Sequence, residues 1–264
     1  MPVTGATLIL VGSALAILCM MLAVWATSLV MRDASIVDIA WGSGFVLVAW
    51  VSYWLGEGNS TRSLLLTVLT SIWGLRLAFY LAKRNLGHGE DFRYQSMRRK
   101  HGARFAFVSL YTVFGVQGFL MWIVSLPVQL GQVNTDPSFG VVGIIGVAVW
   151  GVGMFFEAVG DAQLARFKRD PANKGQVMNR GLWRYTRHPN YFGDSCVWCG
   201  LGLIAAESRT GVFGLIGPAL MTFLLVKVSG AALLDRAMLK RKPGYELYVA
   251  TTSGFIPRPP RRIQ

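Results

Sequence analysis

The chain has 264 residues, of which 53% are hydrophobic and 15% are charged, with a mean hydropathy of +0.45 and a formal net charge of +13. Its apolar runs of about 20 residues or more exclude a soluble domain of this length. Only three histidines are present, which excludes the multi-histidine di-iron membrane oxygenases, and we predict no metal site. The positive charge is explained by membrane topology, so nucleic-acid binding is not expected.

The apolar runs predict an all-α polytopic membrane protein with seven transmembrane helices in a single domain, residues 1–264. The predicted spans are residues 4–31, 34–55, 63–82, 105–130, 139–160, 191–206 and 211–234. The sixth is short for a span of about 20 residues. The first has no charged n-region and is longer than the apolar core of a signal peptide, so we expect it to be retained.

Basic residues set the predicted orientation. Segments 83–104, 161–189 and 235–264 each hold seven Lys/Arg and two Asp/Glu, so together they carry +15 and the rest of the chain −2. With seven spans these segments fall on one side, which the positive-inside rule makes cytosolic. We therefore expect the N-terminus outside, the C-terminus in the cytosol and, in a prokaryote, insertion in the inner membrane.

Asp38 is the first chemically informative residue in chain order, about one turn inside the second span. An ionisable group at this depth is costly and is a functional candidate by default. Trp41 shares its helix face at i, i+3, as Trp73 does with Arg76 on the third span. Arg76 either snorkels or pairs with Asp38. Alternatively Asp38 is protonated, because burial disfavours its charged form, and this excludes the pair.

The basic segments interleave cations with aromatic residues, which is typical of a surface that binds phosphates and rings. Near the cytosolic end of the fifth span, Glu157 and Asp161 lie at i, i+4 and stack on one helix face. The candidates in the basic segments at this stage are Arg84, Arg93, Tyr94, Lys168, Asp235, Arg236, Tyr245 and Tyr248.

Residues 179–194 carry the densest set of polar groups. Pro189 biases His188 away from the helical conformation and suits the first turn of a following helix, whose positive end favours anions. The simpler alternative is a basic loop that only contacts lipid headgroups, but Asn190 and Asp194 would add nothing to that attraction. The polar residues of this segment include Arg180, Arg184, Tyr185, Arg187, His188, Asn190, Tyr191 and Asp194.

The predicted topology brings the charged residues of the spans to one depth. Asp38, Arg76, Glu157, Asp194 and Lys227 all fall in the cytosolic half of the membrane. We therefore predict a polar cavity that opens to the cytosol and is bordered by lipid.

Several motifs carry a family resemblance. Arg187-His-Pro-Asn190-Tyr191 with Gly193-Asp194, the Asp235-Arg236 pair, and Tyr245-x-x-Tyr248 to Phe255-Ile-Pro257 resemble the steroid 5α-reductase family. Residues 35–42 and 90–94 resemble its bacterial members of formerly unknown function. The resemblance runs from about residue 32 to 258. It implies a seven-helix membrane reductase that takes NADPH from the cytosol and reduces the C4–C5 double bond of a 3-oxo-Δ4 steroid or related enone.

The resemblance also implies site residues by position. Asp38 and Trp73 fall where the family has its catalytic acid and Tyr, and Trp41 and Arg76 are expected at the substrate. Since Trp can donate a hydrogen bond but is no phenolic acid, either Asp38 supplies the acid or the substrate differs. The implied NADPH contacts are Arg84, Arg93, Tyr94, Glu157, Asp161, Lys168, Tyr185, Arg187, His188, Asn190, Tyr191, Asp194, Asp235, Arg236, Tyr245 and Tyr248.

Two other functions remain open. Membrane methyltransferases of the isoprenylcysteine and phospholipid types share the Arg-His-Pro-x-Tyr signature and bind S-adenosylmethionine, but generally have fewer spans. A non-enzymatic lipid or sterol binder explains the cavity but leaves Asn190, Asp194 and Asp235-Arg236 without a role. We expect a monomer that draws a hydrophobic steroid or enone from the bilayer and has membrane lipid as its other partner.

Overall fold

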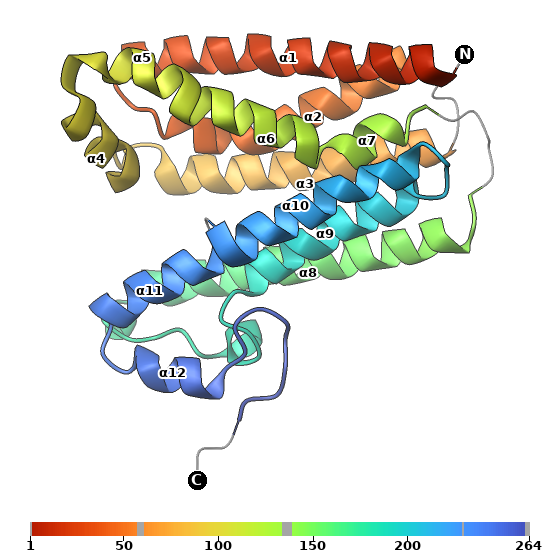
Figure 1. The fold of residues 1–264 in the computed structure, drawn as a ribbon. Coiled ribbons are helices and arrows are strands. Elements are labelled where there is room, and N and C mark those ends of the chain that lie inside the picture. The colour runs from red at the N-terminus through yellow and green to blue at the C-terminus, as the bar shows by residue number, and fades with distance from the viewer. Residues whose placement is uncertain (1, 57–60, 134–138, 229, 262–264) are drawn as a thin grey trace. The chain divides into compact units, whose positions relative to one another are not determined.

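The computed structural model describes residues 2–56, 61–133, 139–228 and 230–261. Helices dominate this described part, which contains no strand, so the all-α prediction is confirmed. The contact pattern divides the chain into two compact units (Figure 1). Unit 1 comprises residues 1–144 and 201–217, and unit 2 comprises residues 145–200 and 218–264. That the chain forms one functional domain stays a prediction.

Unit 1 contains most of the N-terminal helices, of which α1, α2 and α3 pack side by side (Figure 1). Its elements are α1 (Pro2–Met31), α2 (Ile36–Leu55), α3 (Thr61–Asn85), α4 (Phe92–His101), η1 (Gly102–Arg104), α5 (Phe105–Ser109), η2 (Leu110–Gly115), α6 (Val116–Val124), α7 (Leu126–Leu130) and η5 (Gly211–Leu215). The η2 segment is a π-helical turn, a feature that is frequent at functional sites.

Unit 2 contains the C-terminal helices and a long loop that ends at α9. The boundaries between the units fall within three helices, α8, α9 and α10. Its elements are α8 (Val141–Arg169), η3 (Pro171–Asn173), η4 (Gly181–Arg184), α9 (Pro189–Ala205), α10 (Ile216–Phe223), η6 (Leu224–Val228), α11 (Ala231–Arg241) and α12 (Tyr245–Thr251). The prediction that a helix begins at Pro189 is confirmed.

Among the residues that the structure describes, six helical stretches are long and apolar enough to cross a membrane, which confirms a polytopic membrane protein. They are Gly5–Met31, Ile36–Leu55, Thr61–Asn85, Phe92–Val124, Val141–Arg169 and Gly211–Arg241. Each overlaps one of the predicted spans. The remaining predicted span, residues 191–206, corresponds to α9, which has 17 residues and falls short of this length.

Helices also continue into segments that the sequence predicts to be cytosolic connections. The sequence predicts that the fifth span ends at residue 160, but α8 continues to Arg169, and α4 forms from Phe92 onward within segment 83–104. A hydropathy pattern places the end of a membrane span where charged residues begin. The helix continues beyond that point because Gln, Met, Lys and Arg are good helix formers.

Glycines allow α2 and α3 to approach closely. A Cβ atom at Gly42 would lie 2.3 Å from the carbonyl oxygen of Gly74, and one at Gly74 would lie 2.5 Å from that of Gly42. The backbones therefore touch, which is the usual effect of small residues in membrane helix pairs. This contact holds the helix that carries Asp38 against the one that carries Trp73.

Glu207 caps the beginning of α8. Its Oε1 atom accepts hydrogen bonds of 2.8 Å from the N–H groups of both Gly140 and Gly143. Its Oε2 atom lies 3.8 Å from Nη2 of Arg62, which is 1% exposed. A carboxylate at the positive end of a helix is favourable, so Glu207 ties α8 to α3 within unit 1.

Candidate active site

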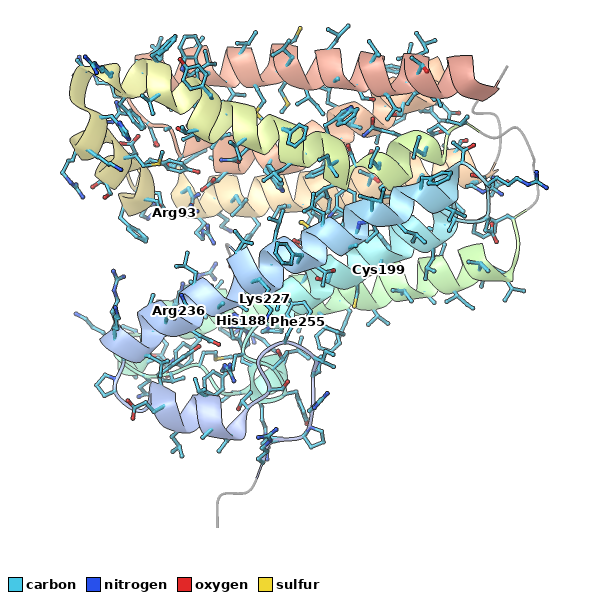
Figure 2. The ribbon with its side chains drawn as sticks, viewed as in Figure 1. Arg93, His188, Cys199, Lys227, Arg236 and Phe255 are labelled. Atoms are coloured by element: carbon cyan, nitrogen blue, oxygen red, sulfur yellow. The ribbon has the colours of Figure 1, made fainter. Side chains whose placement is uncertain are left out.

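Asp38 lies at the centre of a polar cluster in unit 1. Its Oδ1 atom accepts a 2.8 Å hydrogen bond from the Tyr94 hydroxyl, and its Oδ2 atom accepts one of 2.8 Å from Nη2 of Arg93. Nε2 of Gln117 donates to the Tyr94 oxygen at 3.3 Å. We call these four residues the Asp38 cluster. Arg93 stands at the beginning of α4 (Figure 2), and Gln117 comes from α6.

Hydrogen bonds hold the segment before α4 against the beginning of α2, and this contact positions the residues of the Asp38 cluster. Glu90 accepts hydrogen bonds from the Ala34 N–H at 2.9 Å and from the Arg98 guanidinium at 2.8 and 3.0 Å. Asp91 caps α4 by accepting 2.9 Å hydrogen bonds from the N–H and Nε of Arg93. These contacts turn Arg93 and Tyr94 toward Asp38.

Both carboxylates before α4 are stabilised in their charged form. Burial alone would raise the pKa of Glu90, but the hydrogen bonds from Arg98 and the Ala34 N–H outweigh burial and lower it below its usual value. Burial would also raise the pKa of Asp91, but the hydrogen bonds from Arg93 outweigh burial and lower that pKa below its usual value. The connection between α3 and α4 therefore depends on two ionised acids.

Three aromatic side chains extend from Asp38 into unit 1. The rings of Trp41 and Phe45 meet edge to face at 5.3 Å, and those of Phe45 and Trp73 at 5.4 Å. Trp73 is fully buried, whereas Trp41 and Arg76 are half-buried. Trp41 is therefore the more accessible of the two predicted tryptophans.

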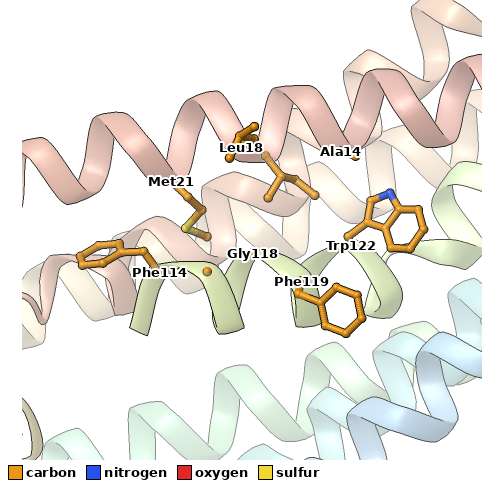
Figure 3. Close-up of a pocket in the computed structure, with 9 residues that line it drawn as sticks. Ala14, Leu18, Met21, Phe114, Gly118, Phe119 and Trp122 are labelled. Atoms are coloured by element: carbon orange, nitrogen blue, oxygen red, sulfur yellow. The ribbon is translucent and has the colours of Figure 1, made fainter. Parts of the chain in front are cut away.

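A hollow of about 300 Å³ lies between α1 and the η2–α6 segment of unit 1 (Figure 3). Gly115 and Gly118 leave space in it, and the Trp122 indole N–H donates a 3.0 Å hydrogen bond to the Leu10 carbonyl, which ties α6 to α1. Its lining is apolar: Ala14, Ile17, Leu18, Met21, Phe114, Gly115, Gly118, Phe119 and Trp122. Both walls belong to stretches able to cross a membrane, so this hollow suits a hydrocarbon.

Asp235 lies at the centre of a second polar cluster, in unit 2. Arg187 donates to its carboxylate through Nη2 at 2.7 Å and through Nε at 3.2 and 3.3 Å. His188 Nε2 lies 3.0 Å from Oδ1, and the Tyr245 hydroxyl donates to the same atom at 2.6 Å. We call these four residues the Asp235 cluster. Burial and the hydrogen bond to Asp235 raise the pKa of Tyr245 above its ordinary value.

The C-terminal segment fastens the loop that carries His188. The Arg187 N–H donates to the Ser253 carbonyl at 2.9 Å, and Thr186 Oγ1 donates to the Phe255 carbonyl at 2.8 Å. Nη1 of Arg187 donates to the Thr252 carbonyl at 2.5 Å. The Tyr248 hydroxyl donates to the Trp183 carbonyl. This loop is thus an internal part of unit 2, which argues against a loop that only contacts lipid.

Acids and an amide lie where α8 and α9 pack together in unit 2. Glu157 and Asp161 on α8 and Asp194 on α9 are buried, at 3%, 4% and 9% exposure. Asn190, half-buried, donates from Nδ2 to Asp161 Oδ1 at 3.4 Å. A Cβ atom at Gly193 would lie 2.6 Å from the Glu157 nitrogen, so the two helices touch here. The structure brings these four predicted residues together.

The other predicted residues of the basic segments lie at the surface or beside the clusters. Tyr191 stacks on His188, with ring centroids 5.6 Å apart. Arg84 lies over the Tyr80 ring at 5.8 Å in unit 1. The exposed residues among the predicted unit 2 contacts are Lys168, Tyr185 and Arg236, and Arg180 and Arg184 are exposed near them.

Three features of the site were not predicted. Sequence patterns single out neither Gln117 nor the pairing of Tyr94 with Asp38, because both depend on how α4 and α6 pack against α2. The ion pair of Asp38 with Arg93 was likewise not predicted. The presence of Glu90 and Asp91 beside Arg93 was the available signal that this segment is ordered.

The fold and the two clusters define a polytopic helical membrane protein with a carboxylate–phenol pair. A family model described as "Protein of unknown function (DUF1295)" matches residues 24–252, and the chain belongs to this family. An uncharacterised protein of Schizosaccharomyces pombe is 23% identical over 265 residues, which cover 89% of this chain and 75% of that protein. No solved structure matches.

Named relatives are found over shorter stretches. The 3-oxo-5-alpha-steroid 4-dehydrogenase 1 of Mus musculus is 31% identical over 114 residues, covering 42% of this chain and 43% of the mouse protein. The Homo sapiens protein of the same name is 34% identical over 80 residues, covering 30% of this chain and 29% of its own length. The chain thus aligns with less than half of either relative. The resemblance to the steroid 5α-reductase family is confirmed.

Proposed function

We propose that the protein is a membrane reductase that uses NADPH to reduce the C4–C5 double bond of a 3-oxo-Δ4 steroid or a related enone. Similarity to the 3-oxo-5-alpha-steroid 4-dehydrogenase 1 proteins supports the reaction class. The hydrogen bond between Tyr94 and Asp38 carries the assignment of the site. When hydride adds to the β-carbon of an enone, negative charge develops on its carbonyl oxygen, so the site needs a donor there. A phenol held by a carboxylate is such a donor.

Tyr94 is the group that we assign to the carbonyl oxygen. Gln117 donates a hydrogen bond to the Tyr94 oxygen, so the Tyr94 O–H group itself is left to be shared between Asp38 and the substrate. Asp38 holds the hydroxyl in place, and Arg93 balances the charge of Asp38. Tyr94 thereby takes the role that position alone assigned to Trp73, whose indole N–H cannot serve as a phenolic acid. Trp41 remains a substrate contact, and Arg76 stays a proposal for the same role.

The residues of unit 2 fit a nicotinamide dinucleotide. A bound NADPH supplies the hydride. Glu157, Asp161, Asn190 and Asp194 offer acceptors and an amide for its carboxamide and hydroxyl groups. Exposed arginines and Lys168 suit its phosphates, which favours NADPH over NADH. Arg187 is engaged with Asp235 and two backbone carbonyls, so we assign it to holding the loop rather than to a phosphate.

A hydrophobic substrate suits the apolar hollow of unit 1. The hollow of about 300 Å³ is at the lower end of the range for ligand pockets. Its walls are Ile17, Met21, Phe114 and Trp122 among others, and nothing in this lining favours a charged molecule. We infer that the steroid or enone enters unit 1 from the bilayer.

The membrane topology completes the proposal. We infer that α9 is a seventh crossing that begins below the interface, since 17 residues span about 25 Å. With seven crossings the N-terminus lies outside and the three basic segments lie in the cytosol, where the cofactor is drawn. The protein acts as a monomer in this proposal, in the inner membrane of a prokaryote.

The deciding experiment titrates detergent-purified protein with NADPH, NADH and S-adenosylmethionine in parallel, followed by turnover of a 3-oxo-Δ4 steroid. Tight NADPH binding with consumption of the enone and equimolar oxidation of NADPH is the expected result. Binding of S-adenosylmethionine alone would overturn the proposal in favour of a membrane methyltransferase. Binding of steroid without either cofactor would leave a lipid or sterol binder.

A further inference from the structure

Two glutamines are fully buried in unit 1, away from the Asp38 cluster. Gln129 is the penultimate residue of α7, and Gln132 lies in the turn that follows. The Gln132 N–H donates to the Gln129 carbonyl at 3.3 Å, so the two residues lie next to each other. Nε2 of Gln129 donates to the Trp122 carbonyl at 2.8 Å and to Ser125 Oγ at 2.7 Å. Both hydrogens of this amide are therefore used.

Gln132 is held in the same manner by α3. Its Nε2 atom donates to the Ser63 carbonyl at 3.2 Å and to Thr67 Oγ1 at 3.1 Å. Exchanging the amide oxygen and nitrogen of either glutamine would place an oxygen against a backbone carbonyl, acceptor against acceptor. The hydrogen-bond partners therefore fix the orientation of both amides.

Three oxygen atoms in this region lack a hydrogen-bond partner among the described residues: Oε1 of Gln129, Oε1 of Gln132 and Oγ1 of Thr70. All three residues are 0% exposed. Thr70 lies one helical turn after Thr67 on α3, on the side that faces Gln132. Buried polar atoms are almost always hydrogen-bonded, and in a membrane protein bulk water cannot reach them through lipid.

We propose that these three oxygens line a buried water site in unit 1. A water molecule can donate one hydrogen to each glutamine Oε1 and accept the hydroxyl hydrogen of Thr70, three hydrogen bonds, the usual number for a buried water. The lining groups carry no charge, so a metal cation there would be uncompensated and costly. Water is the ligand that satisfies both the acceptors and the donor.

The site lies behind the apolar hollow. The carbonyl of Trp122 accepts from Gln129, while its indole ring lines the hollow and donates to Leu10. Trp122 thus contacts Gln129 through its carbonyl and borders the hollow with its ring, which Figure 3 shows. The α6 helix ends at Val124, and the bound water stabilises the break before α7, as ordered waters do at interrupted membrane helices.

X-ray hydroxyl-radical footprinting of the purified full chain tests the site, because radiolysis of an internal water oxidises side chains that bulk radicals cannot reach. The reporter is Leu66, which is 0% exposed, lies between Ser63 and Thr70 on α3 and points toward Gly131. The comparator is Val48 on α2, also 0% exposed. We expect Leu66 to be oxidised and Val48 not to be.

The double variant Gln129→Leu/Gln132→Leu should lose the oxidation of Leu66. The matched control Ser13→Ala, which removes a buried hydroxyl paired with Ser52 at 3.2 Å, should keep it. Oxidation of Val48 would rise in any variant that unfolds, so misfolding is recognised directly. Wild-type oxidation of Leu66 no faster than that of Val48 would overturn the water site, and so would unchanged oxidation in a folded double variant. Neither result depends on NADPH or on turnover.

Discussion

The Tyr94 hydroxyl donates a 2.8 Å hydrogen bond to Asp38 although 56 residues separate them in the sequence. Two features make this contact. Asp38 lies in the first turn of α2, and Glu90 binds the Ala34 N–H just before that helix. Because α4 begins directly after Asp91, its first turn is brought to the first turn of α2. The phenol and the carboxylate therefore form one site.

Exchanging Tyr94 for Phe tests the proton donor. Tyr94→Phe removes only the hydroxyl, so we expect turnover of the enone to fall about 10²- to 10⁴-fold, the usual contribution of a positioned acid. Trp73→Phe should instead lower thermal stability, since Trp73 is fully buried, while turnover of the folded protein persists. The measurement is steady-state turnover beside thermal unfolding of each variant. Loss of turnover only in Trp73→Phe would return the donor role to Trp73.

Asp38→Asn tests whether the charge of the carboxylate matters. The amide keeps an acceptor for Tyr94 but loses the ion pair with Arg93, which then retains the carboxylate of Asp91 as its partner. We expect turnover to fall about 10²-fold or more, with unchanged affinity for NADPH, because electrostatic orientation of the donor is lost. Asp170→Asn is the control, since Asp170 is an exposed cap in unit 2. Unchanged turnover would remove Asp38 from the reaction.

Hydropathy and charge were sufficient to predict the helical membrane fold, since apolar length decides whether a helix can span a bilayer. They located the beginning of α9 as well, because Pro189 fixes its own backbone whatever surrounds it. They did not predict which cation pairs with Asp38. The contact of Arg93 with Asp38 depends on the turn that Glu90 and Asp91 build before α4, and helix periodicity does not reveal that turn.

Asn190→Ala tests the cofactor residues of unit 2. The amide contacts Asp161 and lies in the first turn of α9, so its loss removes both a donor and an acceptor from the proposed dinucleotide site. We expect the dissociation constant for NADPH to rise several-fold, equivalent to about 1 kcal/mol for one hydrogen bond. Titration by intrinsic fluorescence measures it, with Asn173→Ala in the loop after α8 as control. An unaltered affinity would contradict the assignment of this loop.

Arg187 and Arg236 should respond differently to the same substitution. Arg187 makes five hydrogen bonds from its side chain, to Asp235, Val249 and Thr252, whereas Arg236 is exposed. Lysine cannot reproduce the planar fork, so Arg187→Lys should cost about 2 kcal/mol of stability. Arg236→Lys should leave the unfolding temperature unchanged. Equal unfolding temperatures for both variants would show that the Asp235 cluster contributes nothing to the fold.

The sequence also could not show which of the three arginines before α9 is held inside the protein. Three arginines at 180, 184 and 187 are equivalent as phosphate ligands in a linear sequence. Only the folded C-terminal segment distinguishes them, because the Thr252 and Ser253 carbonyls meet Arg187 and leave the other two exposed. Burial of a cation is decided by partners distant in the chain.

The connection before α4 should weaken in acid. The folded-state pKa of Glu90 is lowered from its ordinary value of 4.5, so its stabilising effect is complete above that pH and is lost as the pH falls through the lower folded value. Thermal unfolding measured from pH 7 down to about pH 3 should therefore show that the wild type loses stability below pH 4.5. The Glu90→Gln variant should lose less stability over the same range, because it has no carboxylate to protonate. Glu246→Gln, at an exposed position on α12, is the matched control. Identical pH profiles for wild type and Glu90→Gln would mean that the bonds from Arg98 and the Ala34 N–H do not depend on the charge of Glu90, and the ordered turn that places Tyr94 would then need another cause.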